Sequence, residues 1–538
     1  MLINIGLIII IQKLVKKLYN IELPKLSREY VIDSDENSEY MYNTIAEIID
    51  KCGPRAPCSA AESKASELVA ERLKEYCDSV NIEKFNAYPR AFLGWIRLDI
   101  GLIVISFIMF LSFYWFYLLF GNILILLIGT LICLGMGLFG LLIFYKQFFN
   151  YKEWTPKFLP YKKGTSQNVI GVIKPSSDIR KRVVFSAHID SAFRFNLQHY
   201  TKQGYAYFFI AGVIALISFI ILYLIQLIFI FLTNNISVIL TYILIWIILI
   251  IPIFLAFYIL ILGKSKKVLY GSIKNVSLIG YVLILAVTAY NLFIDILFWN
   301  YYYYNPNILK IVIWMAIKDI PVIFALFFFL SKKATPGAID NLSAVAPVMC
   351  IAKILKDWKE NHQELFPKTT EVVISIVGSE EIGLRGSEAF AKKHAVEYNK
   401  INTTVVNCES LSESRYQKIF TRENTTRTDL SPEVYNRLAE CCEDLKIDYK
   451  LCPMPSVAGG TDAAGFVRGE LKASSLEGII WEDYLWYYHT DRDNLSLINK
   501  KRRPCTEFGA NWKNRNVRCA MENGLKICLK YLEKVDKA

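Results

Sequence analysis

The chain has 538 residues, of which 54% are hydrophobic, and it carries a formal net charge of +12. Its mean hydropathy of +0.31 is too apolar for an ordinary soluble protein and is typical of a membrane protein with a sizeable polar part. The basic residues form no single block of the kind that binds nucleic acid, and many of them flank apolar segments instead.

Twelve cysteines are scattered through the chain, without CxxC pairs and without the spacing of a small disulfide-rich domain. The adjacent Cys441 and Cys442 are interpreted as two free thiols. This usage predicts reduced cysteines in a domain that faces the cytosol.

Residues 1–20 are predicted to form an N-terminal anchor segment. The apolar run at residues 2–11 is short for a span and is followed by Lys13 and Lys16. Because a secretory signal would place its positive charges first, an amphipathic helix at the membrane interface is the preferred interpretation. An apolar stretch extending to Leu18 would instead add a seventh span.

Three separated stretches, residues 40–97, 146–203 and 334–538, have soluble α/β character. The expected helices are Ala60–Tyr76, Leu342–Trp358, Gly386–His394, Pro432–Leu445 and Ala520–Val535, and the expected strands are Cys77–Phe85, Asn168–Lys174, Val183–Ala187, Glu371–Val377 and Thr403–Cys408. We interpret the three stretches as one discontinuous domain.

Two apolar regions interrupt this domain: a predicted transmembrane hairpin at residues 98–145 and a predicted four-helix insertion at residues 204–332. The six expected spans are Ile100–Phe120, Ile123–Tyr145, Tyr207–Leu232, Ile236–Leu262, Val276–Trp299 and Ile311–Leu330. Even numbers of spans return the chain to the same side of the bilayer, so all soluble pieces share one face. The lysine-rich loops on that face predict a multi-pass integral membrane protein with a cytoplasmic domain.

Three charged residues, Asp295, Lys318 and Asp319, lie within or near the last two spans. Charges inside a bilayer are costly and often functional. An ion pair between Asp295 and Lys318, or a position near the headgroups, is the preferred interpretation because such charges commonly pair or snorkel.

The stretch Val183–Ser191 contains an apolar strand that ends in a His-x-Asp pair. This places His188 and Asp190 at the carboxyl end of a strand, where α/β proteins build their sites. The imidazole of His188 can bind a metal, and Asp190 can bind one or orient its neighbour. A lone pair of this kind is more often structural, so its meaning depends on later residues.

Three acidic stretches follow, and each has a structural alternative. Asp340 stands in a Pro-Gly turn before a helix, where its two oxygens could bridge two metal ions or cap the helix. Glu380 and Glu381 follow an apolar strand, so one could bind metal while the other acts as a base, unless both occupy an exposed turn. Glu409 ends another strand, either as a ligand or as a solvent-exposed acid.

Two further stretches lie nearer the end of the chain. His489, one of only five histidines, stands among aromatic residues, where a lone histidine is more often part of the core. The glycine-rich turn Gly459–Phe466 is typical of a pocket wall, and equally of a plain turn with Asp462 as helix cap.

In this order, the stretches resemble the co-catalytic di-zinc exopeptidases of metallopeptidase family twenty-eight, which include bacterial leucyl aminopeptidases, aminopeptidase Y and glutamate carboxypeptidase. The family pattern is His-x-Asp, a Gly-x-x-Asp-Asn turn, Glu-Glu-x-Gly-Leu-x-Gly-Ser, Asn-x-Asp/Glu and a Tyr-His-Thr-x-x-Asp end. The matching positions are His188/Asp190, Gly337–Asn341, Glu380–Ser387, Asn407–Glu409 and Tyr488–Asp493. The resemblance excludes the apolar regions and implies a three-layer α/β/α sandwich with a mixed, mostly parallel sheet.

The resemblance implies two zinc ions per chain, bound by imidazoles and carboxylates. His188, Asp340 and Glu381 would bind one ion. Asp340, Glu409 and His489 would bind the other, with Asp340 shared between the two. Glu409 departs from the aspartate that many aminopeptidases of the family have, which weakens the distinction between aminopeptidase and carboxypeptidase.

The resemblance also assigns roles beyond metal binding. Glu380 would be the general base that takes a proton from the attacking water. Asp190 would orient His188, and Asp493 would do the same near His489.

These features predict a membrane-embedded zinc exopeptidase that acts on peptides, in the first place as an aminopeptidase. A carboxypeptidase and a glutaminyl-cyclase-like enzyme are alternatives on the same fold, although cyclases of this fold use one zinc and would not need both His188 and Glu409. A catalytically inactive receptor or a transporter is the alternative outside enzymes. Receptors typically lose ligands that this chain keeps, and the three intramembrane charges are few for a transporter.

Overall fold

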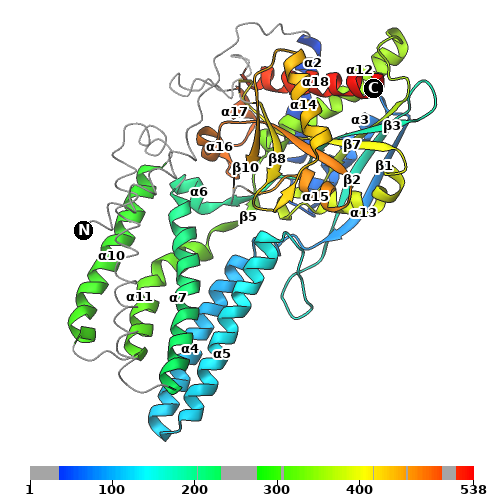
Figure 1. Cartoon of the computed structure of the whole chain (residues 1–538). Coiled ribbons are helices and arrows are strands. Elements are labelled where there is room, and N and C mark those ends of the chain that lie inside the picture. The colour runs from blue at the N-terminus through cyan, green and yellow to red at the C-terminus, as the bar shows by residue number, and fades with distance from the viewer. Residues whose placement is uncertain are drawn as a thin grey trace.

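The computed structural model describes residues 35–202, 204–231, 276–303, 308–415, 417–455, 459–499 and 516–538. An α/β domain stands at one end of a bundle of long helices (Figure 1). The expected anchor at residues 1–20 and the expected span Ile236–Leu262 lie outside the described residues.

The α/β domain is built on a mixed sheet with the strand order β1-β2-β6-β3-β7-β11-β8-β10, and β9 pairs with β8. Its strands are β1 (Ser79–Ala87), β2 (Gly164–Ile173), β3 (Lys181–His188), β6 (Thr370–Val377), β7 (Asn402–Leu411), β8 (Gln417–Glu423), β9 (Thr428–Asp429), β10 (Tyr449–Met454) and β11 (Lys472–Gly478). The central strands β6, β3, β7 and β11 run parallel, so their carboxyl ends meet at one edge of the sheet. Strand β6 is buried along its whole length, which explains its almost unbroken apolar sequence.

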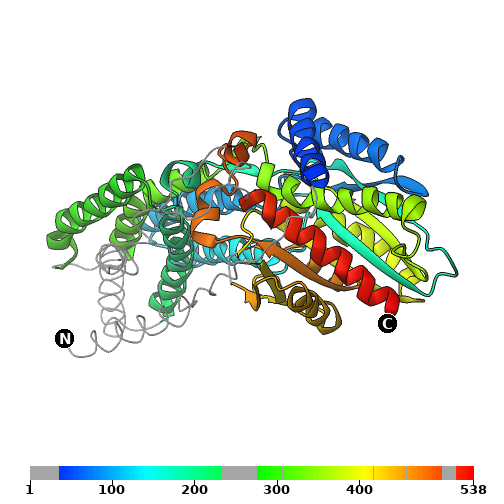
Figure 2. The ribbon, with the colours of Figure 1, turned by 90° about the horizontal axis from the view of Figure 1, so that it is seen from above.

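Helices cover both faces of the sheet. One face carries α2 (Asp35–Cys52), α3 (Ala60–Leu73), α12 (Ser343–Asn361), α14 (Pro432–Asp444) and α18 (Asn516–Lys537), and the other carries α13 (Arg385–Tyr398) and α15 (Asp462–Arg468). Helices α12 and α18 lie side by side over the sheet (Figure 2). The predicted α/β sandwich with a mixed, mostly parallel sheet is therefore confirmed.

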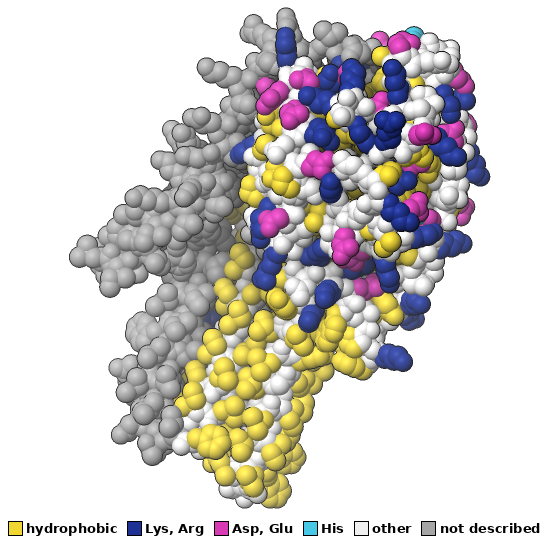
Figure 3. Space-filling model, turned by 45° about the vertical axis from the view of Figure 1, so that its right-hand side comes forward, with side chains coloured by type: hydrophobic (Ala, Val, Ile, Leu, Met, Phe, Trp, Pro, Cys, Tyr) yellow, Lys and Arg dark blue, Asp and Glu magenta, His cyan; other side chains and the backbone are white. Residues whose placement is uncertain are grey.

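The helices of the bundle have apolar exteriors. They are α4 (Trp95–Phe120), α5 (Ile123–Phe144) with the π-helical turn η1 (Tyr145–Phe149), α7 (Tyr205–Phe231), α10 (Leu278–Tyr303) and α11 (Ile308–Phe327). Trp115 is 62% exposed and Phe120 69% exposed. Figure 3 shows this hydrophobic surface below the mixed charges of the α/β domain. Such an exterior suits contact with lipid rather than with water.

Five helices within the described residues are long and apolar enough to cross a membrane, as judged by length and composition. Four of them are α4, α5 with η1, α7 and α10, and they occupy expected spans. The fifth, Ala338–Asn361, is 89% buried because it comprises α12 and the turn before it, inside the sandwich. At the sixth expected span α11 is helical, but it contains three charged residues and is not among the five.

The charges in the bundle are partly paired. Lys318 Nζ lies 2.7 Å from Asp295 Oδ1, which also accepts a hydrogen bond from the Trp314 indole, so the predicted ion pair is confirmed. A further buried carboxylate, Asp99 in α4, was not among the predicted charges of the spans. Its side chain is 4% exposed, neither carboxylate oxygen has a hydrogen-bond partner among the described residues, and it faces Gly140 of α5.

Both apolar regions leave and rejoin the α/β domain at nearly one place. Before α4 and after α5, the rings of Phe92 and Tyr151 lie 4.8 Å apart. At the second region, β4 (Phe193–Phe195) pairs antiparallel with β5 (Leu330–Ala334), and the short helix α6 (Asn196–Thr201) then leads toward α7. The sheet is therefore continuous despite the insertions.

The described cysteines form no disulfide. Cys441 and Cys442 are free and buried, in agreement with their interpretation as thiols.

Candidate metal centre

The predicted site residues lie together at the carboxyl edge of the central strands. His188 ends β3, Glu409 lies near the end of β7, and Glu380 with Glu381 forms the turn η3 (Glu380–Ile382) after β6. Asp340 comes from the π-helical turn η2 (Ala338–Leu342) and His489 from the loop after α16 (Trp481–Tyr487). All six residues line one pocket.

Asp340 lies between the two histidines. Its Oδ1 is 3.4 Å from His188 Nε2, and its Oδ2 is 3.5 Å from His489 Nε2. One oxygen thus faces each imidazole, as expected for a carboxylate that is shared by two cations. The structure does not use Asp340 as a helix cap, because the N-cap positions of η2 and α12 are held by Gly337 and Leu342.

The division of the remaining ligands differs from the prediction. Glu409 Oε2 lies 3.5 Å from His188 Nε2, and Glu381 Oε2 lies 3.0 Å from His489 Nε2. Three compact groups occur among the described residues: His188 with Asp340 and Glu409, His489 with Asp340 and Glu381, and His188 with Glu380 and Glu381. Neither predicted set, His188 with Asp340 and Glu381 or Asp340 with Glu409 and His489, is among these groups. The reason is that β7 lies directly beside β3, whereas η3 turns toward the His489 loop.

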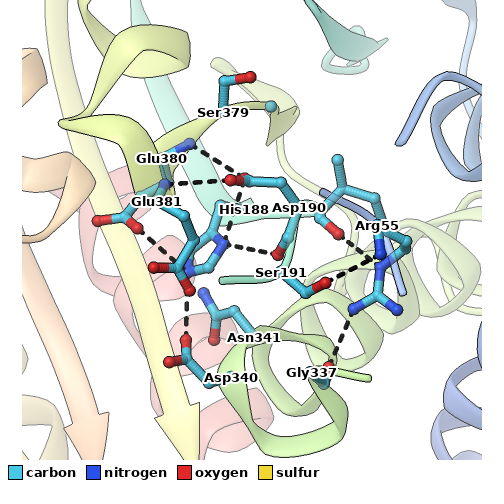
Figure 4. A network of polar contacts seen from close by, with 12 residues as sticks. Arg55, His188, Asp190, Ser191, Gly337, Asp340, Asn341, Ser379, Glu380 and Glu381 are labelled. Carbon is cyan, nitrogen blue, oxygen red and sulfur yellow. Dashed lines mark hydrogen bonds and ion pairs between the residues drawn. The ribbon is translucent and has the colours of Figure 1, made fainter. Parts of the chain in front are cut away.

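Asp190 contacts both His188 and the turn that carries the two glutamates (Figure 4). Its Oδ1 lies 3.5 Å from His188 Nδ1. The backbone N–H groups of Glu380 and Glu381 donate to its two oxygens, each at 3.0 Å. Asp190 is fully buried and positions two elements, of which the sequence analysis expected one.

Asp493 does not orient His489. Its carboxylate accepts the backbone N–H groups of Ile339 and Asp340 at 2.7 and 3.0 Å, whereas Nδ1 of His489 has no hydrogen-bond partner among the described residues. The expectation was wrong because the turn after His489 directs Asp493 toward η2. Asp493 therefore supports the shared Asp340.

Residues 328–505 match the family model described as peptidase family M28. The matched segment contains Asp340, Glu380, Glu381, Glu409 and His489, five of the six clustered residues. This segment is similar to peptidase family M28, and the α/β domain that contains it is called the M28 domain below. His188 and Asp190 precede the matched segment, on the other side of the second insertion, and the M28 domain is completed by them in space.

Several solved structures are similar to the chain at low identity. A zinc aminopeptidase from Bacillus subtilis has 11% identity, covers 93% of this chain and 95% of its own, and has a TM-score of 0.42. The LapA aminopeptidase from Legionella pneumophila has 11% identity, coverage of 97% and 79%, and a TM-score of 0.41. A glutaminyl cyclase from an Acidobacteriales bacterium has 9% identity, coverage of 96% and 99%, and a TM-score of 0.42. No curated protein matches the sequence.

Arg55 links the two ligand-bearing loops of the M28 domain, and the sequence analysis missed it because a lone arginine in a loop gives no signal. Its guanidinium is fully buried and donates to the carbonyls of Ile189, Gly53, Pro336 and Gly337. Figure 4 shows Arg55 beside Gly337. Ile189 adjoins His188, and Gly337 precedes Asp340. The guanidinium therefore joins loops that are separated in sequence by the second apolar region.

The carboxylates of the M28 domain are also held from outside the cluster. Asn341 Nδ2 and Asn407 Nδ2 donate to the two oxygens of Glu409 at 2.9 and 3.0 Å. The Tyr484 hydroxyl donates to Asp340 Oδ2 at 3.0 Å. The ring of Tyr488 stacks on His489 with a centroid separation of 3.6 Å. These contacts fix the orientation of side chains that would otherwise rotate freely.

The cluster has an excess of negative charge. Burial lowers the pKa of His489, but Glu381 and Asp340 outweigh burial and raise that pKa to about 9. The pKa of His188 likewise lies well above its usual value, because Glu380 and Glu409 outweigh burial. Burial raises the pKa of Glu380, and repulsion by Glu381 adds to the effect while His188 opposes it. Such a site favours cations.

The donor set of the M28 domain fits zinc. Each compact group offers one imidazole nitrogen and carboxylate oxygens within 4.8 Å of one another, and none of these groups contains a thiol. Imidazole and carboxylate without thiolate are typical ligands of hydrolytic zinc. Glu381 Oε1 is buried without a hydrogen-bond partner among the described residues, as a ligand atom would be.

Proposed function

We propose that the protein is a membrane-embedded, zinc-dependent exopeptidase that releases N-terminal residues from peptides. The observation that carries the proposal is the placement of Asp340 between His188 and His489, with Glu380 beside them. The match to peptidase family M28 supports a peptidase, and the ligand chemistry supports zinc.

Two groups of residues would hold the metal ions. His188, Asp340 and Glu409 would hold one zinc, and Asp340, Glu381 and His489 the other. When bound, the zinc pair would polarise the scissile carbonyl and make water more acidic.

Glu380 is the proposed base. Its Oε2 lies 3.8 Å from His188 Nε2 in the pocket, and neither group that contains Asp340 requires it as a ligand. It would take a proton from the attacking water and pass it to the leaving amine. The hydrogen bonds to Asp190 hold the backbone of the turn while this proton moves.

The bundle supports a multi-pass membrane protein. Four helices outside the sandwich are long and apolar enough to span, and their exteriors are hydrophobic. The lysines of the loops next to the α/β domain favour a cytoplasmic position for that domain.

The decisive test is hydrolysis of one peptide in three forms, free, N-acetylated and C-amidated, by the detergent-purified full chain. We expect zinc-dependent release of N-terminal residues that is blocked by acetylation. Glu380→Gln should lower the rate by about 10²–10⁴-fold with both zinc ions retained. Glu397→Gln is the matched control, because Glu397 is exposed on α13.

Other outcomes separate the alternatives. Hydrolysis blocked only by amidation would identify a carboxypeptidase, which the glutamate at position 409 also allows. Release of ammonia or water from N-terminal glutamine or glutamate, without peptide-bond cleavage, would identify a cyclase. Absence of both metal and turnover would favour a receptor.

A further inference from the structure

The loop 152–163 follows α5 and turns back along it (Figure 1). Gln147, in the last turn before the loop, donates from Nε2 to the Trp154 carbonyl at 2.8 Å. The rings of Trp154 and Phe158 lie 5.9 and 6.1 Å from the ring of Phe139. Phe139 stands ten residues before Phe149, the end of the candidate span, so the loop descends roughly 15 Å along that helix.

The returning part of the loop is also held against the hairpin. Leu159 is buried, and its N–H donates to the Pro156 carbonyl at 2.9 Å in a turn. Tyr161 lies against the beginning of α4, where a Cβ on Gly94 would meet its ring at 3.4 Å. The loop therefore has a defined position on the two helices.

The outer side of the loop combines one apolar ring with several positive charges. Phe158 is 71% exposed although it lies beside a candidate span. Lys157, Lys162 and Lys163 are exposed around it. An exposed aromatic ring among lysines, at the end of a hydrophobic surface, is typical of elements that lie in a membrane interface.

We propose that the loop 152–163 is a membrane-surface element that binds anionic phospholipid. Phe158 enters the acyl region beside Phe139, and Lys157, Lys162 and Lys163 contact lipid phosphates. We infer lipid as the binding partner because the loop is continuous with the apolar exterior of α5. The positive lysines also complement the negative charge of lipid phosphates. This inference rests on the proposed insertion of α4 and α5 in a bilayer and adds a contact that no span makes.

The loop also connects the bilayer to the M28 domain. Tyr151, the residue before the loop, accepts a hydrogen bond at its carbonyl from Arg385 Nη2 at 2.7 Å. Its ring lies against Gly460, which lines the pocket. A lipid-bound loop therefore sets the position of the pocket relative to the membrane surface.

The first test uses the full chain in nanodiscs of phosphatidylcholine and phosphatidylserine, with the photoreactive p-benzoylphenylalanine at single positions. We expect irradiation to attach phospholipid at position 158. Val396, which is 81% exposed on α13, is the control and should attach none. Position 115 on α4 reports whether the bundle itself contacts lipid.

The outcomes are distinguishable. Lipid attached at 115 but not at 158 would overturn the inference and leave the membrane proposal intact. No lipid at either position would overturn both. Lipid attached at 396 as strongly as at 158 would show that labelling is nonspecific and would also count against the inference.

The second test concerns the lysines. We expect the triple variant Lys157→Gln, Lys162→Gln and Lys163→Gln to retain several-fold less phosphatidylserine than wild type in native mass spectrometry. A matched triple variant of exposed lysines on the α/β domain, Lys392→Gln, Lys400→Gln and Lys450→Gln, should retain the wild-type amount. Equal retention by all three proteins would overturn the assignment of the lipid phosphates to the loop.

Discussion

The backbone N–H of Glu380 donates a hydrogen bond of 3.0 Å to Asp190 Oδ1, so the proposed base is held by the same carboxylate that faces His188. The second oxygen of Asp190 holds the next residue, Glu381. A change at Asp190 should therefore disturb a ligand and the base together.

We predict that Asp190→Asn lowers both kcat and zinc affinity by roughly 10–100-fold, a size that is common for residues behind metal ligands. The two backbone N–H groups bind different oxygens of Asp190, and in asparagine an NH2 donor replaces one of these oxygens, so one N–H group loses its acceptor. Asp536→Asn is the control, since Asp536 also accepts two backbone N–H groups, from Lys368 and Thr369, away from the site. The role of Asp190 would be refuted if the two variants had equal kinetics and metal content.

Arg55→Lys should weaken metal binding without any change in a ligand. A lysine ammonium cannot donate to four carbonyls in the planar arrangement of the guanidinium. We expect a loss of about 2–4 kcal/mol of stability, the value of one or two hydrogen bonds to a charged group. The measurement is zinc content and thermal midpoint. Arg437→Lys on α14 should leave both unchanged.

The metal-free protein should lose stability as pH rises. The pKa of His489 is raised from 6.5 to about 9, and burial raises the pKa of Asp493 from 3.8 to about 7. A group whose pKa is higher in the folded state stabilises it below the unfolded pKa, and this stabilisation disappears as pH rises through the folded pKa.

These two groups set a window from about pH 4 to pH 9. We expect the thermal midpoint of the EDTA-treated protein to fall between pH 6 and pH 9, in the upper part of this pH window. Saturating zinc should reduce this fall because metal binding favours the deprotonated ligands. A midpoint that rises with pH in the metal-free protein would contradict the prediction.

Lys318→Met should destabilise the bundle more than the double variant Asp295→Leu/Lys318→Met does. Among the described residues, the single change leaves Asp295 buried with only the Trp314 indole as a partner, and breaking a buried pair costs about 3–5 kcal/mol. Replacing both residues leaves no buried charge without a partner of opposite charge. The stabilities of the two variants are compared by thermal inactivation in detergent. Equal midpoints would contradict the prediction that the single variant is less stable.

The sequence predicted those site residues whose position follows from the local succession of strand and turn. A buried strand followed by a polar residue places that residue at the edge of the sheet, which was enough to find His188, Glu380 and Glu409. The α/β class followed from the same alternation of strands and helices.

The wrong predictions concern the directions in which side chains point, because these depend on tertiary structure. Asp493 follows His489 closely in sequence, yet it faces η2. The exchange of Glu381 and Glu409 between the two groups depends on which strands are neighbours. Asp99 lies at the beginning of a span, where charges usually reach the interface, yet it is buried and faces Gly140.

The pairing of β4 with β5 has a consequence for the order of events in biosynthesis. His188 leaves the ribosome long before Asp340, and the proposed four-helix insertion is synthesised between them. On the proposed topology, the second half of the metal centre is made only after these helices have been translated. A chain whose helices fail to insert would lack a complete centre, so maturation of the hydrolase would depend on its delivery to the membrane.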